Sequence, residues 1–370
     1  MRAETRTRTD WQLSDTAIRT FRRRAPARWA MLLPMTQARS RLVPANAHGI
    51  YHCVSRCVRR AWLCGRDPLT GADHEHRRQW VEDRLAQLAD LYAVSIWAYA
   101  VMSNHLHVVI EMHADIARTW SPDEIAVRWL GLYPPEDGQY EVAKAQIVGN
   151  SDRLGVLRSR LCSLSWFMKS LSEPIARRAN VEDHCKGRFW EGRFRSQVLL
   201  DETAVLSAMT YVDLNPIRAG MTAHLEGSFH TSILKRIRAV ESAAQSSSPT
   251  IASDVGRAAG DLAHTPVLAP VLGIRGLSVT ALSTADYIQL VDTTGRQWHP
   301  TKRGRISGKP PAVLERLGLD ALQWTERVRA VKPDQGFCRV IGSETALLDK
   351  AAEIGQRWLR GLGVARTLAN

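Results

Sequence analysis

The 370-residue sequence lacks any long apolar run. A membrane-spanning helix needs about 20 consecutive apolar residues, and the apolar stretch 29–35 is far shorter. The first 40 residues also lack the basic, apolar and small-residue order of a secretory signal peptide. Six cysteines without such a signal indicate reduced thiols. We therefore expect no membrane partner and a cytoplasmic location.

Two motifs are also missing. No Cys-x-x-Cys pair occurs, and the spacing of Cys53, Cys57 and Cys64 is not that of a zinc knuckle, so we expect these residues to pack in the core. No GxxxxGK[ST] motif occurs, which counts against a helicase module.

Acidic residues are few compared with basic ones. The chain has 37 Asp and Glu against 50 Lys and Arg, for a formal charge of +13. This excess predicts a polyanionic partner, with nucleic acid ahead of a membrane surface. Arginines are dense in residues 1–40, which form either a flexible arm that contacts phosphates or a poorly folded extension.

The pattern of strands and helices predicts the fold class. Apolar alternation and β-forming residues predict strands over 49–57, 94–102, 105–112 and 194–200. Apolar periodicity predicts helices over 77–92 and 154–175, and Asp201 is a candidate N-cap for a helix that begins at Glu202. The order β-α-β-β, helices, β-α indicates an α+β class, with a ferredoxin-like antiparallel sheet and helices on one face.

Composition divides the chain into regions. The predicted core spans 41–225 and contains an irregular insertion at about 113–152, with one short helix near 122–130. Residues 240–265 are rich in Ala, Ser and Gly and read as a linker. Residues 266–370 form a mostly helical region that includes a basic loop at 302–309. This region is a candidate for further DNA binding.

The stretch AVMSNHLHVVI places His105 and His107 two residues apart in a strand. Side chains at i and i+2 project from one face, so two imidazoles can converge on one ion. The alternative is a pair of half-buried histidines that bond to the backbone. His74 and His76 have the same spacing in a charged context, and we expect them to be solvated.

The stretch AMTYVDLNPIRAG places Tyr211 and Asn215 one helical turn apart. A phenol can act as a nucleophile, and an amide oxygen suits a hard cation such as Mg²⁺ or Mn²⁺. The alternative is a core tyrosine followed by a C-capping asparagine. Pro216 disfavours helical geometry at Asn215, so Asp213 or a water molecule is an alternative ligand.

The stretch GRFWEGRFRSQ interleaves arginines with aromatic residues. Arg188, Arg193 and Arg195 can hold phosphates while Trp190 stacks on an unpaired base. The alternative is simple alternation, with the aromatic rings in the core and the arginines in solvent.

Taken together, YHCVSR, AVMSNHLHVVI, RFWEGRFRSQ and YVDLNPIRAG resemble the single-tyrosine HUH-type transposases. Within these, residues 41–225 are most similar to the REP-associated tyrosine transposases and their insertion-sequence relatives. The resemblance implies a divalent ion, Mg²⁺ or Mn²⁺, held by His105 and His107 with Asn215 as a further ligand, and Tyr211 as the nucleophile. It also implies DNA contacts from the arginine-aromatic stretch and from Arg218.

The implied activity is a DNA transposase that cleaves and rejoins single-stranded, hairpin-flanked DNA through a 5′-phosphotyrosine intermediate. With one such tyrosine per chain, a monomer must act twice or a homodimer must supply two. Two alternatives remain: a DNA-binding protein derived from a transposase that no longer cuts, and a replication or relaxation nuclease with the same chemistry.

Overall fold

The computed structural model describes residues 39–44, 46–58, 62–68, 70–246, 268–274, 280, 282–297, 306, 314, 319–331 and 338–367. Almost all of the predicted N-terminal arm, the linker after residue 246 and most of the basic loop at 302–309 lie outside these residues.

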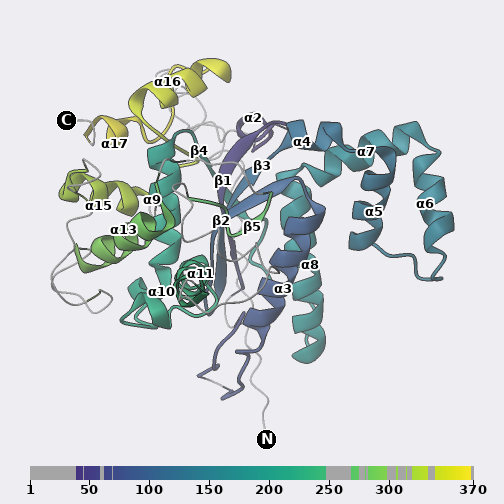
Figure 1. The fold of residues 1–370 in the computed structure, drawn as a ribbon, viewed down its shortest axis with the longest axis horizontal. Helices are drawn as coiled ribbons and strands as arrows, with labels where there is room; N and C mark the ends of the chain where they lie inside the picture. The colour runs from purple at the N-terminus through teal and green to yellow at the C-terminus, as the bar shows by residue number, and fades with distance from the viewer. Residues whose placement is uncertain are drawn as a thin grey trace, which may run out of the picture. The chain divides into compact units, whose positions relative to one another are not determined.

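A six-stranded sheet in the order β5-β2-β3-β1-β4-β6 lies at the centre of the fold (Figure 1). Its strands are β1 (Gly49–Arg56), β2 (Val94–Val101), β3 (His105–Met112), β4 (Arg195–Leu199), β5 (Leu272–Gly273) and β6 (Val340–Ile341). The neighbouring strands run antiparallel except β4 and β6, which are parallel. The predicted α+β class is confirmed, but the sheet is mixed, because a late strand adds beside β4 in the same direction.

Helices cover both faces of the sheet, so the prediction that they cover one face is wrong. One core holds side chains of α3 (Arg77–Leu91) and α8 (Leu164–Glu182). The opposite core holds those of α9 (Glu202–Asp213), α11 (Ser232–Ser246), α13 (Thr284–Gln297) and α15 (Ala321–Ala330). Figure 1 shows the two groups on opposite sides of β2. The physical reason is that every residue of β2 is buried, so both of its faces need an apolar cover.

The insertion is largely helical rather than irregular. It contains α4 (Ala114–Thr119), α5 (Pro122–Leu132), α6 (Tyr140–Val148) and the start of α7 (Ser151–Leu161). Ser121 and Glu124 form a capping box at the start of α5, with Pro122 in its first turn, so this helix begins where the sequence favours one.

The helix predicted over 154–175 is interrupted. α7 ends at Leu161 and α8 begins at Leu164, because Ser163 has an extended backbone (φ −102°, ψ 122°). The Leu161 carbonyl accepts a hydrogen bond from the Ala93 amide at 3.0 Å, so the end of α7 is tied to the residue that precedes β2.

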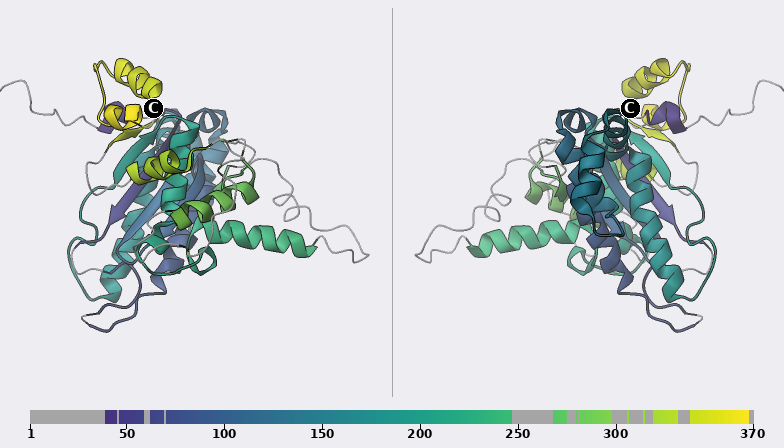
Figure 2. Two further views of the ribbon diagram at one scale, coloured as in Figure 1. Left: turned by 90° about the vertical axis from the view of Figure 1, so that its left-hand side faces the viewer. Right: turned by 90° about the vertical axis from the view of Figure 1, so that its right-hand side faces the viewer.

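The remaining elements are α2 (Arg39–Leu42), α10 (Asn215–Arg218), the 3-10 helix η1 (Leu225–Gly227), α16 (Glu344–Glu353) and α17 (Leu362–Thr367). Figure 2 shows α11 extending away from the sheet, and its last residues fall within the predicted linker. The predicted domain boundaries stay predictions, although β5 and β6, which follow that linker, join the sheet. Among the described residues, no helix combines the length and apolar composition that crossing a bilayer requires.

Candidate functional site

The two histidines of β3 lie side by side on the sheet face that α9 covers. Their ring centroids are 4.8 Å apart, and the rings are nearly perpendicular. His107 is 1% exposed, whereas His105 is partly open to solvent. Nδ1 of His105 lies 2.7 Å from Oδ1 of Asn104 and donates to it, which directs this nitrogen away from the role of a ligand.

Helix α9 brings Tyr211 over this pair. The helix follows β4 directly, and the Asp201 side chain caps its start by accepting from the Ala204 amide at 2.8 Å, as the sequence predicted. The Tyr211 ring centroid lies 5.7 Å from that of His107. The structure therefore brings together Tyr211 and the His105–His107 pair, which are far apart in the sequence.

A third histidine, which the sequence reasoning did not single out, lies behind the pair. His52 is fully buried on β1, and its Nε2 is 2.9 Å from Nδ1 of His107. Its Nδ1 is 2.7 Å from Oε1 of Gln197 on β4. The Gln197 amide nitrogen donates in turn to the Cys338 carbonyl at 2.9 Å. We call His107, His52, Gln197 and Cys338 the histidine relay.

Burial keeps the relay neutral. Burial lowers the pKa of His52 to about 4, partly opposed by its hydrogen bond to Gln197. Burial, followed by the charges of His105 and His52, lowers the pKa of His107 well below its usual range. Both imidazoles therefore carry a single N–H at neutral pH.

The direction of the relay fixes the tautomers. Because the Gln197 nitrogen donates to Cys338, its oxygen must accept, so His52 carries its proton on Nδ1. Nε2 of His52 then accepts from Nδ1–H of His107. Nε2 of His107 is left with its lone pair, which is the form that binds a cation.

Basic side chains surround the pair. The Arg218 guanidinium lies 4.5 Å from the Tyr211 ring centroid. Cross-strand partners share a face of a sheet, so Arg56, opposite His105, lies on the site face. Arg195 is opposite Val54, which is itself opposite His107, so Arg195 lies on that face too and is exposed. Arg56 was missed by the sequence reasoning, although it ends the YHCVSR stretch.

Asn215 and Asp213 have different surroundings. Asn215 is the first residue of α10, and its buried Nδ2 has no hydrogen-bond partner in the described part of the chain. Asp213 is fully buried and accepts from the Ile233 amide at 3.0 Å and the Tyr287 hydroxyl at 2.6 Å. Burial raises the pKa of Asp213, although these donors oppose the shift. Asp213 thus takes part in the contacts between α9, α11 and α13. The side-chain amide nitrogen of Asn215, by contrast, has no hydrogen-bond partner among the described residues.

The arginine-aromatic stretch follows the alternating pattern. Trp190 is half-buried, and its indole nitrogen donates to the Ser172 carbonyl at 2.9 Å. Arg188 and Arg193 are exposed. Packing within the protein therefore explains the Trp190 ring, and DNA binding by this stretch stays a prediction.

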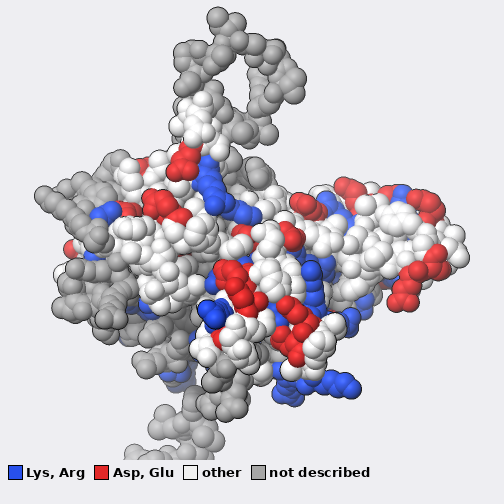
Figure 3. Space-filling view, turned by 90° about the horizontal axis from the view of Figure 1, so that it is seen from below, with Lys and Arg blue, Asp and Glu red and all other residues white. Residues whose placement is uncertain are grey.

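Charge on the described surface is mixed. On the face in Figure 3, basic and acidic side chains are interspersed, and neither kind covers it alone. The basic groups that matter for the candidate site are therefore the local ones, not a continuous basic surface on that face.

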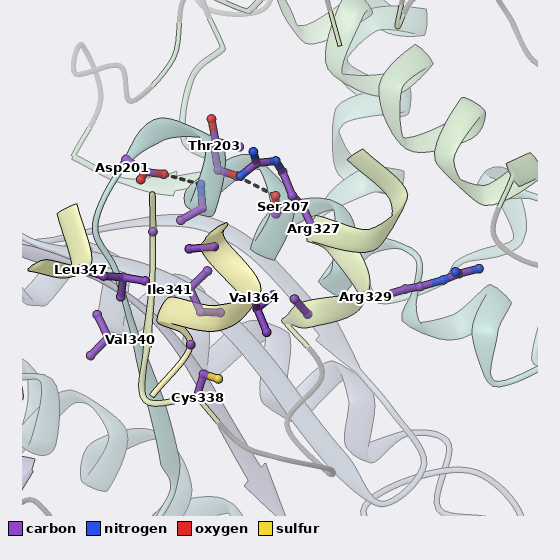
Figure 4. Close-up of a pocket in the computed structure, with 15 residues that line it drawn as sticks. Asp201, Thr203, Ser207, Arg327, Arg329, Cys338, Val340, Ile341, Leu347 and Val364 are labelled. Atoms are coloured by element: carbon purple, nitrogen blue, oxygen red, sulfur yellow. Dashed lines mark hydrogen bonds between the residues drawn. The ribbon is translucent and has the colours of Figure 1, made fainter. Parts of the chain in front are cut away.

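A cavity of about 260 Å³ lies between the start of α9 and the C-terminal elements (Figure 4). Thr203 and Ser207 line it from α9, Arg327 and Arg329 from α15, and Cys338 from the segment before β6. None of the predicted site residues lines it. The cavity meets the candidate site only through Cys338, where the histidine relay ends.

No protein-family model, curated protein or solved structure matches the chain.

Proposed function

We propose that the protein is a single-tyrosine DNA transposase of the HUH type. Its substrate would be single-stranded DNA near a hairpin, cut and rejoined through a 5′-phosphotyrosine link. The observation that carries the proposal is the placement of the Tyr211 ring 5.7 Å from His107, whose Nε2 is held unprotonated by the histidine relay.

The strand connections support this proposal. The first four strands and the helices α3 and α8 follow the order β-α-β-β-α-β, with the sheet order β2-β3-β1-β4. That connectivity is typical of a ferredoxin-like core, which is the fold that the sequence resemblance implies.

The residues present fit a divalent cation, Mg²⁺ or Mn²⁺. His105 and His107 offer two imidazole nitrogens, and the side-chain carbonyl oxygen of Asn215, at the start of α10, is the candidate oxygen ligand. When bound, such an ion polarises a phosphate oxygen and offsets the charge that develops during attack.

The chain's own groups account for the rest of the reaction. The Tyr211 hydroxyl loses its proton as its oxygen attacks phosphorus, and the bond from phosphorus to the 3′ oxygen breaks. The 3′ oxygen takes up a proton, so a free 3′-hydroxyl remains and the 5′ phosphate is esterified to Tyr211. Arg56, Arg195 and Arg218 are the candidate partners of the DNA phosphates. Because the phosphotyrosine bond retains its energy, rejoining needs no ATP.

DNA is thus the proposed partner, and the cytoplasm the proposed location. A monomer acting twice and a homodimer are both compatible with one nucleophile per chain.

One observation favours the alternative of a DNA-binding protein that does not cut. Tyr211 is only 3% exposed, so little of this residue is open to a substrate as large as DNA. Both functions predict DNA binding, and only the transposase predicts a covalent product.

A denaturing gel separates the two functions. The full-length protein is incubated with Mn²⁺ and a labelled, hairpin-flanked single strand, and a band of protein-linked DNA is expected. Tyr211→Phe should abolish that band, and Tyr133→Phe, at a half-exposed tyrosine beyond α5, should not. Retention of DNA on a native gel without any covalent band would support the binding protein instead.

A further inference from the structure

A second cluster of ligand-type side chains lies at the other end of β3. Glu111 and His113 are at the end of this strand, and His48 immediately precedes β1, which pairs with it. Glu111 is four residues beyond His107, which corresponds to about 14 Å along a strand. The cluster is therefore separate from the His105–His107 pair.

The three side chains have the spacing of ligands to one ion. Their candidate ligand atoms all lie within 4.8 Å of one another. Nε2 of His48 is 3.3 Å from Oε1 of Glu111, and Nε2 of His113 is 3.7 Å from Oε2. Ligand bonds of about 2.0–2.1 Å in a tetrahedral site place ligand atoms about 3.3 Å apart. To close around an ion, the cluster would have to shorten its longest separation, which is at most 4.8 Å, to about 3.3 Å by side-chain rotation.

The burial of Glu111 gives a reason for a cation. The Glu111 carboxylate is 5% exposed, and within the described residues its hydrogen-bond donor is the Trp97 indole, at 2.9 Å. A buried carboxylate with so few donors is poorly compensated unless a positive charge is nearby. The two histidines flank it without meeting hydrogen-bond geometry.

Two neighbours contact the cluster. Trp97 donates to one carboxylate oxygen of Glu111, and a second-layer bond of this kind orients metal ligands in known sites. Ser95 lies 2.8 Å from Nε2 of His113, so it occupies the nitrogen that a cation would take. The Ser95 hydroxyl also donates to the Ile274 carbonyl at 2.7 Å, so it keeps a partner when a cation replaces it at His113.

We propose that His48, Glu111 and His113 bind a transition-metal dication, with Zn²⁺ the best match for two imidazoles and one carboxylate. The His48 side chain is 57% exposed, so the fourth position faces solvent and is open to water or an exogenous ligand. The site joins the segment before β1 to the end of β3. The proposal does not rest on the proposed function, since none of these residues takes part in the DNA chemistry.

Metal titration of the full-length, tag-free protein tests the proposal. The background is the double variant His105→Ala/His107→Ala, which removes the other candidate site. Isothermal titration with Zn²⁺, and the visible absorption of added Co²⁺, should show one bound equivalent in this background. Adding His48→Ala or Glu111→Gln should weaken binding by at least the roughly tenfold that loss of a second-layer partner costs, and the matched exposed-histidine variant His224→Ala should leave it unchanged.

The result is interpretable because His48 is at the surface. Its replacement should leave the metal-free melting temperature unchanged, so a loss of binding reports a lost ligand rather than unfolding. No binding in the double-variant background would overturn the proposal. So would binding whose affinity is the same with and without His48 and Glu111.

Discussion

Nε2 of His52 lies 2.9 Å from Nδ1 of His107, and this contact joins neighbouring strands across 55 positions of sequence. This contact fixes which of the two ring nitrogens of His107 carries the proton. Residues that never touch DNA can therefore influence the candidate site.

Gln197→Leu should weaken the binding of the catalytic cation. The substitution removes the acceptor for Nδ1–H of His52, so the proton is free to move to Nε2 and the donor–acceptor order toward His107 is lost. Losses of this kind cost about 10–100-fold in metal affinity or activity. The measurement is the Mn²⁺ concentration that gives half-maximal DNA cleavage. Gln79→Leu, on the exposed side of α3, is the control, and an unchanged Mn²⁺ dependence in folded Gln197→Leu would refute the relay.

Acid should destabilise the protein through His52. The pKa of His52 is about 4 in the folded protein, against 6.5 in the unfolded chain. Between these values the unfolded state binds more protons, so stability falls as the pH falls. Between pH 7 and pH 5, His52 should lower the free energy of unfolding by about 2 kcal/mol. The lowered pKa of His107 acts in the same direction. Urea unfolding at the two pH values measures it, and His52→Gln should flatten the dependence; an equally steep dependence in that variant would contradict the assignment.

Asn215→Ala and Asp213→Ala should have opposite effects. Asn215 has an amide nitrogen with no partner in the described residues, so its removal should leave stability almost unchanged while raising the Mn²⁺ requirement for cleavage. Asp213→Ala leaves the Tyr287 hydroxyl and the Ile233 amide without an acceptor, which should cost about 3 kcal/mol. Thermal melts and Mn²⁺ titrations of both variants check this. A stable Asp213→Ala protein with a raised Mn²⁺ requirement would instead make Asp213 the ligand.

Arg195→Gln should weaken DNA binding in a salt-dependent way. Arg195 is exposed on the site face, in the same cross-strand row as His107. Loss of one phosphate contact lowers the slope of log affinity against log salt by about 1. Fluorescence anisotropy with a labelled single strand measures the slope. Arg177→Gln, at an arginine paired with Glu173 on α8, should not change it, and an equal effect of the two substitutions would show only the influence of net charge.

Local patterns predicted the elements that carry the site. The alternation in 105–112 and the Asp201 cap depend on residues a few positions apart, so a single sequence shows them. The close approach of Tyr211 to the histidine pair, by contrast, was inferred from the family resemblance. Nothing in its local spacing indicates that contact.

What the sequence did not show depends on distant neighbours. His52 and Gln197 are 145 positions apart, and each looks like an ordinary strand residue until β1 and β4 are paired. The break between α7 and α8 similarly involves the amide of Ala93, which no helical periodicity reveals. The sequence did contain a signal for helices on both faces of the sheet. The stretch VSIWAYAV of β2 is almost continuously apolar, and such runs are typical of strands buried on both sides.

The most direct test of the proposed chemistry is to map the covalent link. The protein is reacted with Mn²⁺ and a hairpin-flanked single strand, digested with protease and nuclease, and analysed by tandem mass spectrometry. The account predicts one nucleotide-modified peptide, with the 5′ phosphate on Tyr211. Cleaved DNA without a modified peptide, or a modification on another residue, would contradict it.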